Sequence, residues 1–560
     1  MAPPKSSRSR RQPAAALEPA LTLAKTPRAE RYRFAAIGMA AGVVWFLSCA
    51  DFDVWPFAWF AMVPTLYVTE RARTHREAFF YAWLTGVVGN GGGFYWIVGL
   101  LVRFGHMPWI LAAAIFALLA AYQGLVFAAF GVSVRAIRTH TRWPMAVLAP
   151  LAIVTFELIL PMIFPFSVAI TQAWQIHVIQ IAELVGQPGV AALLLMVNGA
   201  IYDVLVERPR RPVPALASAG VLAAALVYGH VRIGQVDRDR ASAPTLRIGV
   251  VQPNVSFDQK GRNRALWAAR QLADLQAQSL VLQEAGADLI VWPETGYPYV
   301  VSRGRTADFG VTDPRRILNG FARPLLFGTV TRAPTASARH ANDLWNTATL
   351  IRGDGTFGAR FDKMFLMVFG EYTPGRDTIP LIDDLMPTTT GQFVHGKHVN
   401  VLPFTDDRGR TWRIGPMICY EDILPSLNRE LGAYHPHLLV NLTNDSWFGE
   451  TSEPWEHLAL SVYRTVEMRV DLVRAVNTGV SAFVDAAGRV YTRSYAVNPM
   501  DHPRGADHIL AQVAMREGGH TVFMAIGNAF AYLCALLTAY LLLVRSGIMA
   551  AWLRRRRGLA

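Results

Sequence analysis

The segment RIGPMICYED, residues 413–422, decides the fold of the second half of the chain and contains a candidate nucleophile. Residues 413–418 form a short, largely apolar run typical of a buried strand, and Cys419 follows it at the start of a polar turn. A strand that ends in a sharp turn exposes the residue at the turn and directs backbone N–H groups at an oxyanion. The segment therefore predicts an α/β domain with Cys419 at its active site, although a cysteine after a buried strand is more often a simple core thiol.

The residues on both sides of this segment extend the same α/β pattern over positions 245–515. Short apolar and β-branched runs alternate there with turn signals and amphipathic stretches, as strands alternate with helices. Strands are expected at residues 246–252, 288–292, 324–330, 348–351, 413–418, 438–442 and 473–476, and a helix at residues 262–285. The pattern predicts a mixed sheet covered by helices.

Two further polar residues come directly after apolar runs, where the active sites of α/β proteins gather. Glu294 follows the run DLIVWP, and Lys363 follows the segment FGARFD. Taken singly, Glu294 fits an ordinary turn and Lys363 fits a solvated loop. Together with Cys419 they form a chemical set, because a thiol needs a base and a tetrahedral intermediate needs a positive charge. Glu294, Lys363 and Cys419 are therefore the predicted catalytic residues, and the backbone N–H of Tyr420 is a second candidate donor to the intermediate.

Other kinds of chemistry find little support in the sequence. The three cysteines, Cys49, Cys419 and Cys534, are too scattered for a disulfide framework or a CxxC zinc motif. His457 is the nearest candidate partner for Cys419, but it does not lie in a papain-like context. No GxGxxG or Walker loop occurs in the sequence, so nucleotide binding is not expected. The sequence predicts neither a cofactor nor a bound metal.

The first half of the chain differs in composition from the α/β region. Of the 560 residues, 52% are hydrophobic and only 17% are charged, whereas soluble domains average about 25% charged residues. A helix needs about 20 mostly apolar residues to cross a bilayer. The apolar runs therefore predict eight transmembrane helices, at residues 34–50, 54–69, 79–101, 109–131, 145–163, 190–206, 214–230 and 521–544. Seven such runs before the α/β region exclude a cleaved signal peptide.

Lysine and arginine residues in the loops predict the orientation of these helices. The chain has 54 Lys and Arg against 41 Asp and Glu, a net charge of +13. The excess gathers in the N-terminal tail and in alternate loops at residues 71–76, 135–142 and 208–211. Loops rich in Lys and Arg stay in the cytoplasm, so residues 245–515 are expected in the periplasm and the basic C-terminus inside. Basic residues that flank membrane spans also argue against nucleic-acid binding.

These patterns divide the chain into five parts. We expect a disordered basic cytoplasmic tail at residues 1–33, a seven-helix transmembrane domain at 34–231, a catalytic domain at 245–515, an eighth transmembrane helix at 520–545 and a basic cytoplasmic tail at 546–560. The stretch GNGGG at residues 89–93 predicts a kink or a close packing point in the third span. Glu157, inside the fifth span, is either functional or a structural hydrogen-bonding group.

Five motifs, in the same order, resemble those of the nitrilase (carbon–nitrogen hydrolase) superfamily, and most closely those of bacterial apolipoprotein N-acyltransferases. The motifs are WPET at residues 292–295, Lys363 with FGEYTP at 369–374, CYE at 419–421, NDSWFG at 444–449 and RAVNTG at 474–479. The resemblance implies a nitrilase-like αββα sandwich between the seventh and eighth of eight transmembrane helices. It also implies a multi-pass protein of the bacterial inner membrane, with this domain on the periplasmic side.

The resemblance implies roles for individual residues as well. Glu294 would be the general base, Lys363 would stabilise the intermediate, and Cys419 would be the acylated nucleophile. Supporting roles near the site fall to three more residues: Glu371, Tyr420 and Glu421. Glu371 matches a second glutamate that supports activity in the family, and the other two would shape the pocket.

The implied reaction has two steps and no cofactor, and the enzyme is expected to be a monomer. Cys419 takes an acyl chain from a phospholipid as a thioester, and the α-amine of the N-terminal diacylglyceryl-cysteine of an apolipoprotein then accepts it. Two other functions share parts of the pattern. One is a membrane-bound amidase in which water replaces the amine, and the other is a transporter or receptor with an inert sensor domain. A free fatty acid as product would indicate the first, and an unreactive Cys419 the second.

Three positions depart from the family pattern. Residues 365–371 (FLMVFGE) lack the His and Pro that usually precede the glutamate, and an aromatic residue often found after the first strand is missing near Gly261. Glu453 precedes Pro454 in the segment SEP, where the family usually has Ser-x-Gly-Pro. The predicted catalytic residues are all present. The departures lie where substrates would bind, so a different acyl acceptor is an open alternative.

Overall fold

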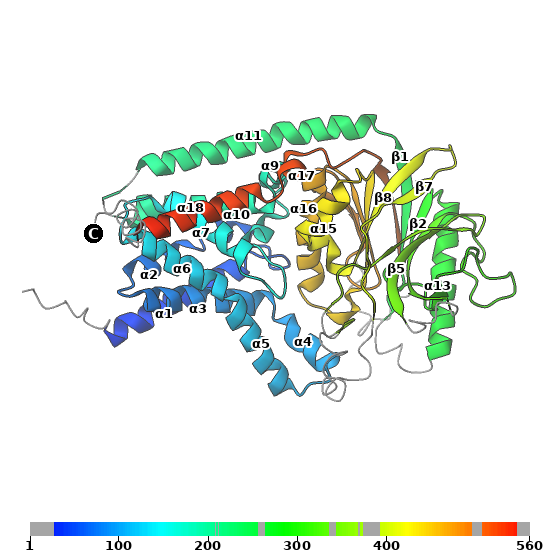
Figure 1. Ribbon diagram of the computed structural model, residues 1–560, viewed down its shortest axis with the longest axis horizontal. Helices are drawn as coiled ribbons and strands as arrows, with labels where there is room; N and C mark the ends of the chain where they lie inside the picture. The colour runs from blue at the N-terminus through cyan, green and yellow to red at the C-terminus, as the bar shows by residue number, and fades with distance from the viewer. Residues whose placement is uncertain are drawn as a thin grey trace, which may run out of the picture.

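The computed structural model describes residues 27–207, 209–210, 212–255, 264–334, 343–367, 370–372, 393–494 and 507–545 (Figure 1). A helical domain lies at one end of the molecule and an α/β domain at the other, and the long helix α11 (Pro212–Ser242) runs from the first to the second. After the α/β domain the chain returns to the helical domain as α18 (Ala529–Arg545). The predicted basic tail at 546–560 and most of the predicted N-terminal tail lie outside the described residues.

Short and medium helices make up the helical domain. Besides α11 and α18 they are α1 (Arg28–Phe46), η1 (Trp55–Trp59), α2 (Val63–Arg71), α3 (His75–Gly93), α4 (Trp96–Arg103), α5 (Trp109–Gln123), α6 (Leu125–Arg138), α7 (Met145–Ile159), η2 (Val168–Gln172), α8 (Ile176–Ile179), α9 (Ala182–Val185), α10 (Gln187–Ile201), η3 (Tyr202–Val206) and α17 (Val522–Ile526). The first turn of α1 corrects the prediction of a disordered tail to residue 33. Glu30 in that turn forms an ion pair with Arg73 at 3.4 Å, and the ring of the buried Phe34 packs on that of Tyr81.

Fewer described helices have the length and composition of a membrane span than the sequence predicts. Among the described residues, three helices are long and apolar enough to cross a membrane: Trp109–Arg138, Gln187–Val206 and Pro212–Ser242. The bent pair α3 and α4 makes a fourth if it counts as one span. The apolar helices Met145–Ile159, Ile176–Val185 and Ala529–Val544 are shorter. The eight-span count is therefore not established, because several apolar runs fold as short or broken helices.

The glycine-rich stretch at residues 89–93 coincides with the break between α3 and α4. The axes of the two helices differ by 57° across this break. On the preceding turn, a Cβ atom on Gly89 would lie 2.0 Å from the ring of Trp45 in α1. Glycine therefore permits α1 to pack closely against the end of α3. The interruption predicted for the third span is confirmed.

The described strands of the α/β domain form two sheets. The first has the order β13-β1-β2-β4-β5-β6 with β3 beside β4, and the second has the order β12-β11-β10-β9-β8-β7. Their bounds are β1 (Thr245–Gln252), β2 (Leu289–Val291), β3 (Val301–Ser302), β4 (Leu325–Arg332), β5 (Leu344–Ile351), β6 (Phe357–Asp362), β7 (Leu402–Thr405), β8 (Thr411–Ile418), β9 (Leu438–Thr443), β10 (Leu472–Val476), β11 (Ala482–Val484), β12 (Val490–Arg493) and β13 (Asp507–Ala514). Neighbouring central strands run parallel: β1 with β2, β2 with β4, and β9 with β8 and β10.

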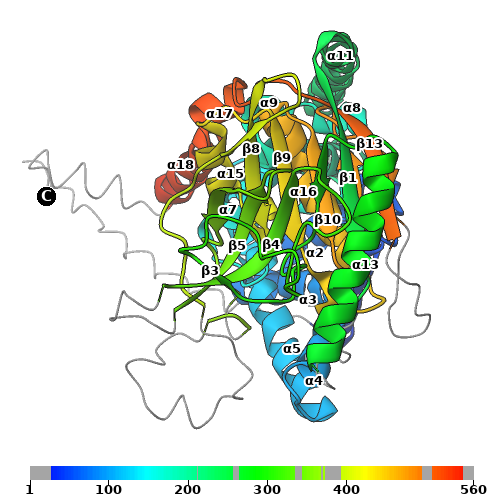
Figure 2. The same ribbon diagram turned by 90° about the vertical axis from the view of Figure 1, so that its right-hand side faces the viewer.

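Helices cover the outer faces of both sheets, so the domain is an αββα sandwich (Figure 2). Helix α13 (Arg264–Glu284) packs on the first sheet through Leu272 and Leu275. Helices α15 (Pro425–Gly432) and α16 (Glu453–Met468) lie between the second sheet and the helical domain. Apolar side chains such as Val250 and Val440 fill the space between the two sheets. This is the nitrilase-like fold that the resemblance implies, with two sheets in place of the single mixed sheet expected from the strand pattern.

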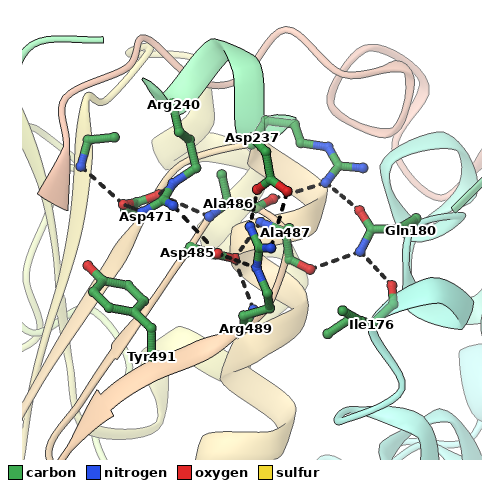
Figure 3. A network of polar contacts seen from close by, with 12 residues as sticks. Ile176, Gln180, Asp237, Arg240, Asp471, Asp485, Ala486, Ala487, Arg489 and Tyr491 are labelled. Atoms are coloured by element: carbon green, nitrogen blue, oxygen red, sulfur yellow. Dashed lines mark hydrogen bonds and ion pairs between the residues drawn. The ribbon is translucent and has the colours of Figure 1, made fainter. Parts of the chain in front are cut away.

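A network of charged side chains joins the α/β domain to the helical domain (Figure 3). Near the end of α11, Arg240 donates two hydrogen bonds to the buried carboxylate of Asp471, at 3.0 and 2.7 Å. Arg489 pairs with Asp237 of the same helix and with Asp485. Ion pairs with two parallel hydrogen bonds have defined geometry. The network therefore connects the α/β domain to the end of α11.

Candidate active site

Glu294 follows β2 at the carboxyl end of the first sheet. The preceding Trp292 is fully buried, and its indole N–H donates a hydrogen bond of 2.9 Å to Ser279 of α13. Gly328 of β4 lies directly against the backbone of Glu294, since a Cβ atom on Gly328 would be 2.7 Å from the Glu294 Cα. This close approach fixes the turn after β2. The Glu294 side chain is thereby held buried at the wall of a cavity.

Lys363 comes directly after β6 and lies between two carboxylates. Its Nζ is 3.0 Å from Oε1 of Glu294 and 2.8 Å from Oε2 of Glu371. The amide of Asn346 in β5 donates hydrogen bonds to both carboxylates, at 2.7 Å to Glu294 and 2.9 Å to Glu371. Sequence reasoning missed Asn346, which lies just before the strand predicted at residues 348–351. Asn346 fixes the spacing of the two glutamates around the ammonium group.

Cys419 sits at the sharp turn that the sequence predicts. Its backbone has φ = 58°, a left-handed conformation that few residues other than glycine adopt. The Cys419 carbonyl accepts a hydrogen bond of 2.8 Å from the side chain of Asn441 in β9. Strand β8 thus ends in an elbow whose thiol enters the same cavity as Glu294, Lys363 and Glu371. The cavity has a volume of about 380 Å³.

Glu421 and Tyr420 connect the cysteine loop to the lysine loop. The Glu421 carboxylate accepts backbone N–H bonds from Met364 at 2.6 Å, Phe365 at 3.0 Å and Ile418 at 2.8 Å. The Tyr420 hydroxyl donates to the carbonyl of Leu366 at 3.2 Å. Burial raises the pKa of Glu421 to about 7. Both residues therefore set the position of Cys419 relative to Lys363.

Burial and charge drive the pKa values of the two glutamates apart. Burial raises the pKa of Glu294; Lys363 opposes this effect and the charge of Glu371 adds to it. Burial acts on Glu371 in the same direction, but the charge and hydrogen bonding of Lys363 outweigh it and hold the pKa of Glu371 below its ordinary value. Paired carboxyl groups with separated pKa values can take different roles. Glu371 is the fixed counter-ion, and Glu294 is the more basic group.

Burial and the neighbouring charges also shift the pKa values of Lys363 and Cys419. Burial alone would lower the pKa of Lys363, but the negative charge of Cys419, once its thiol is ionised, and the charges of Glu294 and Glu371 raise it well above its ordinary value. Burial raises the pKa of the Cys419 thiol well above its ordinary value, and Lys363 offsets this only in part. The resting site therefore holds a charged amine and a protonated thiol, so the thiol needs a base to become a nucleophile.

The wall of the cavity toward the helical domain is aromatic. Trp447 and Phe448 line the cavity, and their rings pack on Phe104 and Trp96 at centroid distances of 4.3 and 4.9 Å. Helix α4 of the bent pair therefore forms the support for this wall. Trp267 of α13 also lines the cavity. Gly261, near which the aromatic residue of the family pattern is missing, lies outside the described residues.

The histidine weighed as a partner for Cys419 has other contacts. His457 donates a 2.8 Å hydrogen bond from its Nε2 to the Asp422 carboxylate in a buried polar cluster. It is not among the described residues that line the cavity.

The motif residues 368–369 and 373–374 lie outside the described part of the chain.

Comparison with known proteins agrees with this architecture. The model for the apolipoprotein N-acyltransferase N-terminal domain matches residues 41–200, and the carbon–nitrogen hydrolase model matches residues 247–497. An apolipoprotein N-acyltransferase of Allorhizobium ampelinum is 30% identical over 438 residues, which are 75% of this chain and 78% of that protein. The chain belongs to the apolipoprotein N-acyltransferase family. It is therefore an acyltransferase with a nitrilase-like domain.

Other members of the family match over still more of the chain. The apolipoprotein N-acyltransferase of Geobacter metallireducens is 29% identical over 511 residues, covering 89% of this chain and 92% of the relative. That of Bdellovibrio bacteriovorus is 28% identical over 477 residues, covering 81% and 84%. Family membership thus extends over both the helical and the α/β domain.

Proposed function

We propose that this enzyme transfers an acyl chain from a phospholipid to the α-amine of the N-terminal diacylglyceryl-cysteine of apolipoproteins, through a thioester on Cys419. The observation that carries the proposal is the cavity in which Cys419 meets Lys363 and its two glutamates. The aromatic wall against α4 supports a lipid substrate, because the apolar side chains of Trp447 and Phe448 line the cavity on the side of the helical domain.

In the first step Glu294 accepts the proton of the Cys419 thiol, and the thiolate attacks the ester carbonyl of the phospholipid. Negative charge develops on the carbonyl oxygen, where the Lys363 ammonium and backbone N–H groups can stabilise it. The C–O bond then breaks, and Glu294 returns its proton to the departing lysophospholipid alcohol. The products of this half-reaction are acyl-Cys419 and a lysophospholipid.

In the second step the lipoprotein amine attacks the thioester carbonyl. Glu294 accepts a proton from the attacking nitrogen, an amide forms, and the C–S bond breaks. The departing thiolate recovers the proton from Glu294, which restores the resting site. Water in place of the amine would produce a free fatty acid, the outcome of the alternative amidase-type hydrolysis.

The direct test follows the acyl chain by intact-protein mass spectrometry. The detergent-purified enzyme is first incubated with a phospholipid of defined acyl composition, and one acyl mass should appear on the peptide containing Cys419. A peptide with an N-terminal diacylglyceryl-cysteine is then added, and the acyl mass should move to its amine. Loss of the thioester to free fatty acid, with the peptide unchanged, would contradict the proposal.

A substitution of Glu371 tests whether this residue acts as the counter-ion of Lys363 or only lines the cavity. Glu371→Gln should slow the formation of acyl-Cys419 by about 10²-fold or more, the scale of losing one preorganised electrostatic contact. The physical reason is that Lys363 loses the carboxylate 2.8 Å from its Nζ. Glu371→Asp should form acyl-Cys419 at a rate between those of the parent and Glu371→Gln, because it keeps the carboxylate charge on a shorter side chain. Single-turnover acylation rates of folded variants provide the measurement, and a Gln variant with the wild-type rate would remove Glu371 from the mechanism.

We further propose that the helical domain spans the bacterial cytoplasmic membrane eight times, with both termini inside and residues 245–515 in the periplasm. The alternating basic loops support this orientation. Exposed apolar side chains on α5 support contact with lipid, with Ile110 79% and Leu118 72% exposed. Both substrates are membrane-anchored, so a periplasmic site must open toward the outer leaflet.

Fusions with a reporter enzyme that is active only in the periplasm test this orientation. A fusion after Ser242, where α11 ends, should be active, and a fusion at the C-terminus should be inactive. The positive-inside distribution of Arg and Lys is the physical basis of both expectations. The reverse pattern of activities would overturn the proposed topology.

A further inference from the structure

A second buried cluster of polar side chains lies behind the loop that carries Cys419. It contains Asp445 of the turn η5 (Asp445–Trp447) together with Glu453 and His457 of α16. His457 Nδ1 lies 3.5 Å from Asp445 Oδ1 and 3.7 Å from Glu453 Oε1. One ligand atom from each residue falls within 4.8 Å of the others, and all three residues are buried.

These distances are long for hydrogen bonds and suit coordination. Nitrogen–oxygen hydrogen bonds are usually 2.7–3.2 Å long. A tetrahedral cation with bonds of about 2.1 Å separates its ligands by about 3.4 Å. The two contacts of His457 Nδ1 therefore match the edges of a coordination tetrahedron better than they match direct hydrogen bonds.

The other ring nitrogen of His457 is already fixed. Its Nε2 is 2.8 Å from Oδ1 of Asp422, which lies in the turn η4 (Cys419–Ile423). A histidine that binds a metal usually donates its second N–H to a carboxylate in this way. In that tautomer the lone pair of Nδ1 faces the oxygens of Asp445 and Glu453, and three electron-rich atoms need a cation or protons between them.

Glu453 provides an independent sign of a missing partner. Its residue is 8% exposed, and its Oε2 is buried without a hydrogen bond among the described residues. A buried carboxylate oxygen without a partner is costly. Around it, three carboxylates face a single guanidinium, because Arg474 pairs with both Asp422 and Asp445, at 2.9 and 3.0 Å.

We propose that Asp445, Glu453 and His457 bind a divalent transition-metal ion of the zinc type. An imidazole ligand favours zinc and its neighbours over magnesium or calcium. No metal site was predicted from the sequence, because its three scattered cysteines have none of the spacings typical of zinc sites. Here Glu453 and His457 are four residues apart on one face of α16, while Asp445 arrives from a separate turn. The proposal stands independently of the acyl-transfer chemistry proposed above.

The ion would connect three segments next to the active site. Asp422 links it to the cysteine turn, Asp445 links it to the wall that carries Trp447, and the other two ligands belong to α16. It would stiffen these segments and take no part in a reaction step. Glu453 stands before Pro454, where the family pattern has glycine.

Metal content is the test. The full-length protein, purified in detergent without a polyhistidine tag, is stripped with chelator, loaded with zinc chloride and dialysed against metal-free buffer. Elemental analysis should find about one zinc per chain. Glu453→Gln should retain less than about one tenth of that amount, because one of three protein ligands loses its charge. Glu453→Gly restores the residue of the family pattern and should lose zinc equally while folding normally.

Two controls make the outcome specific. All proteins carry His520→Gln, because His435, Glu517 and His520 form a more exposed cluster that could also bind zinc. Glu456→Gln is the matched variant, since Glu456 is equally buried on α16 but hydrogen bonds with Trp96 and Ser452 instead; it should keep its zinc. Chelation should lower the melting temperature of the parent by about 5 °C or more and leave Glu453→Gln unchanged.

Two results would overturn the proposal. One is a parent protein that retains no zinc after dialysis. The other is a Glu453→Gln protein that retains as much zinc as the parent, which would place the ion elsewhere. Both results would leave acyl transfer to Cys419 unaffected, so the failure of one proposal is distinguishable from the failure of the other.

Discussion

Replacing Cys419 with alanine should reduce acyl transfer by at least about 10⁴-fold, because the enzyme loses the atom that carries the acyl group. Of the three cysteines, all in the described part of the chain, only Cys419 lines the cavity together with Lys363 and Glu294. No acyl mass should appear on the variant after incubation with phospholipid. The fold should persist, since the left-handed backbone at residue 419 is set by the turn and by the hydrogen bond from Asn441.

The controls for this prediction use the other two cysteines. Cys49 and Cys534 are buried in the helical domain, so a variant with alanine at both positions should keep wild-type acylation. Cys419→Ser should be slower than the parent, because a hydroxyl is a much weaker nucleophile than a thiol near neutral pH. A Cys419→Ala protein that still transfers acyl chains would show that the mechanism proposed here is wrong.

Replacing Lys363 with methionine should have the second-largest effect. The ammonium group is 1% exposed and lies within 3.0 Å of both glutamates. Its loss should slow acylation of Cys419 by about 10³-fold, because no positive charge then faces the oxyanion. It should also lower the free energy of unfolding by about 3–5 kcal/mol at neutral pH, since two buried carboxylates lose their counter-ion. Single-turnover mass spectrometry and thermal unfolding measure the two effects.

The stability loss in Lys363→Met should depend on pH in a defined direction. Without the ammonium, burial and mutual repulsion raise the pKa of the carboxyl groups of Glu294 and Glu371 above their unfolded values. A carboxyl with a raised folded-state pKa destabilises the protein when it is ionised and ceases to do so when the pH falls through that pKa. The difference in melting temperature from the parent should therefore shrink between pH 8 and pH 5.

A double variant checks the origin of that loss. Lys363→Met combined with Glu371→Gln removes one carboxylate along with the amine, so it should be more stable than Lys363→Met alone while remaining inactive. Equal stability of the single and double variants would contradict a counter-ion role for Lys363 in this site.

Local sequence patterns predicted most strands of the catalytic domain and the residues that follow them. Short apolar runs bounded by turn residues predicted strands at the positions of β1, β2, β4, β5, β8, β9 and β10. Such runs mark strands because a buried strand needs apolar side chains along its length. Glu294, Lys363 and Cys419 were recognisable for the same reason, since each ends or follows an apolar run. The chemical roles assigned to them remain predictions.

Tertiary structure decided how these residues meet. Glu294 and Lys363 are 69 positions apart in the chain, yet the order of strands in the first sheet brings their side chains to 3.0 Å. Asn346, which binds both glutamates, had no local signal beyond being a polar residue in a strand. Contacts of this kind depend on which strands become neighbours, and side-chain periodicity carries no information about strand order.

The helical domain shows the same limit in another form. Hydropathy shows which stretches avoid water, and the length of the apolar runs predicts helices, so residues 34–231 could be recognised as an apolar helical region. Where each helix ends was decided by packing, as at Gly89 against Trp45 and at the 57° bend between α3 and α4. The cluster of Asp445, Glu453 and His457 likewise exists only because α16 packs beside the cysteine turn. The sequence shows which residues the cluster contains, but the distances between their side chains depend on the fold.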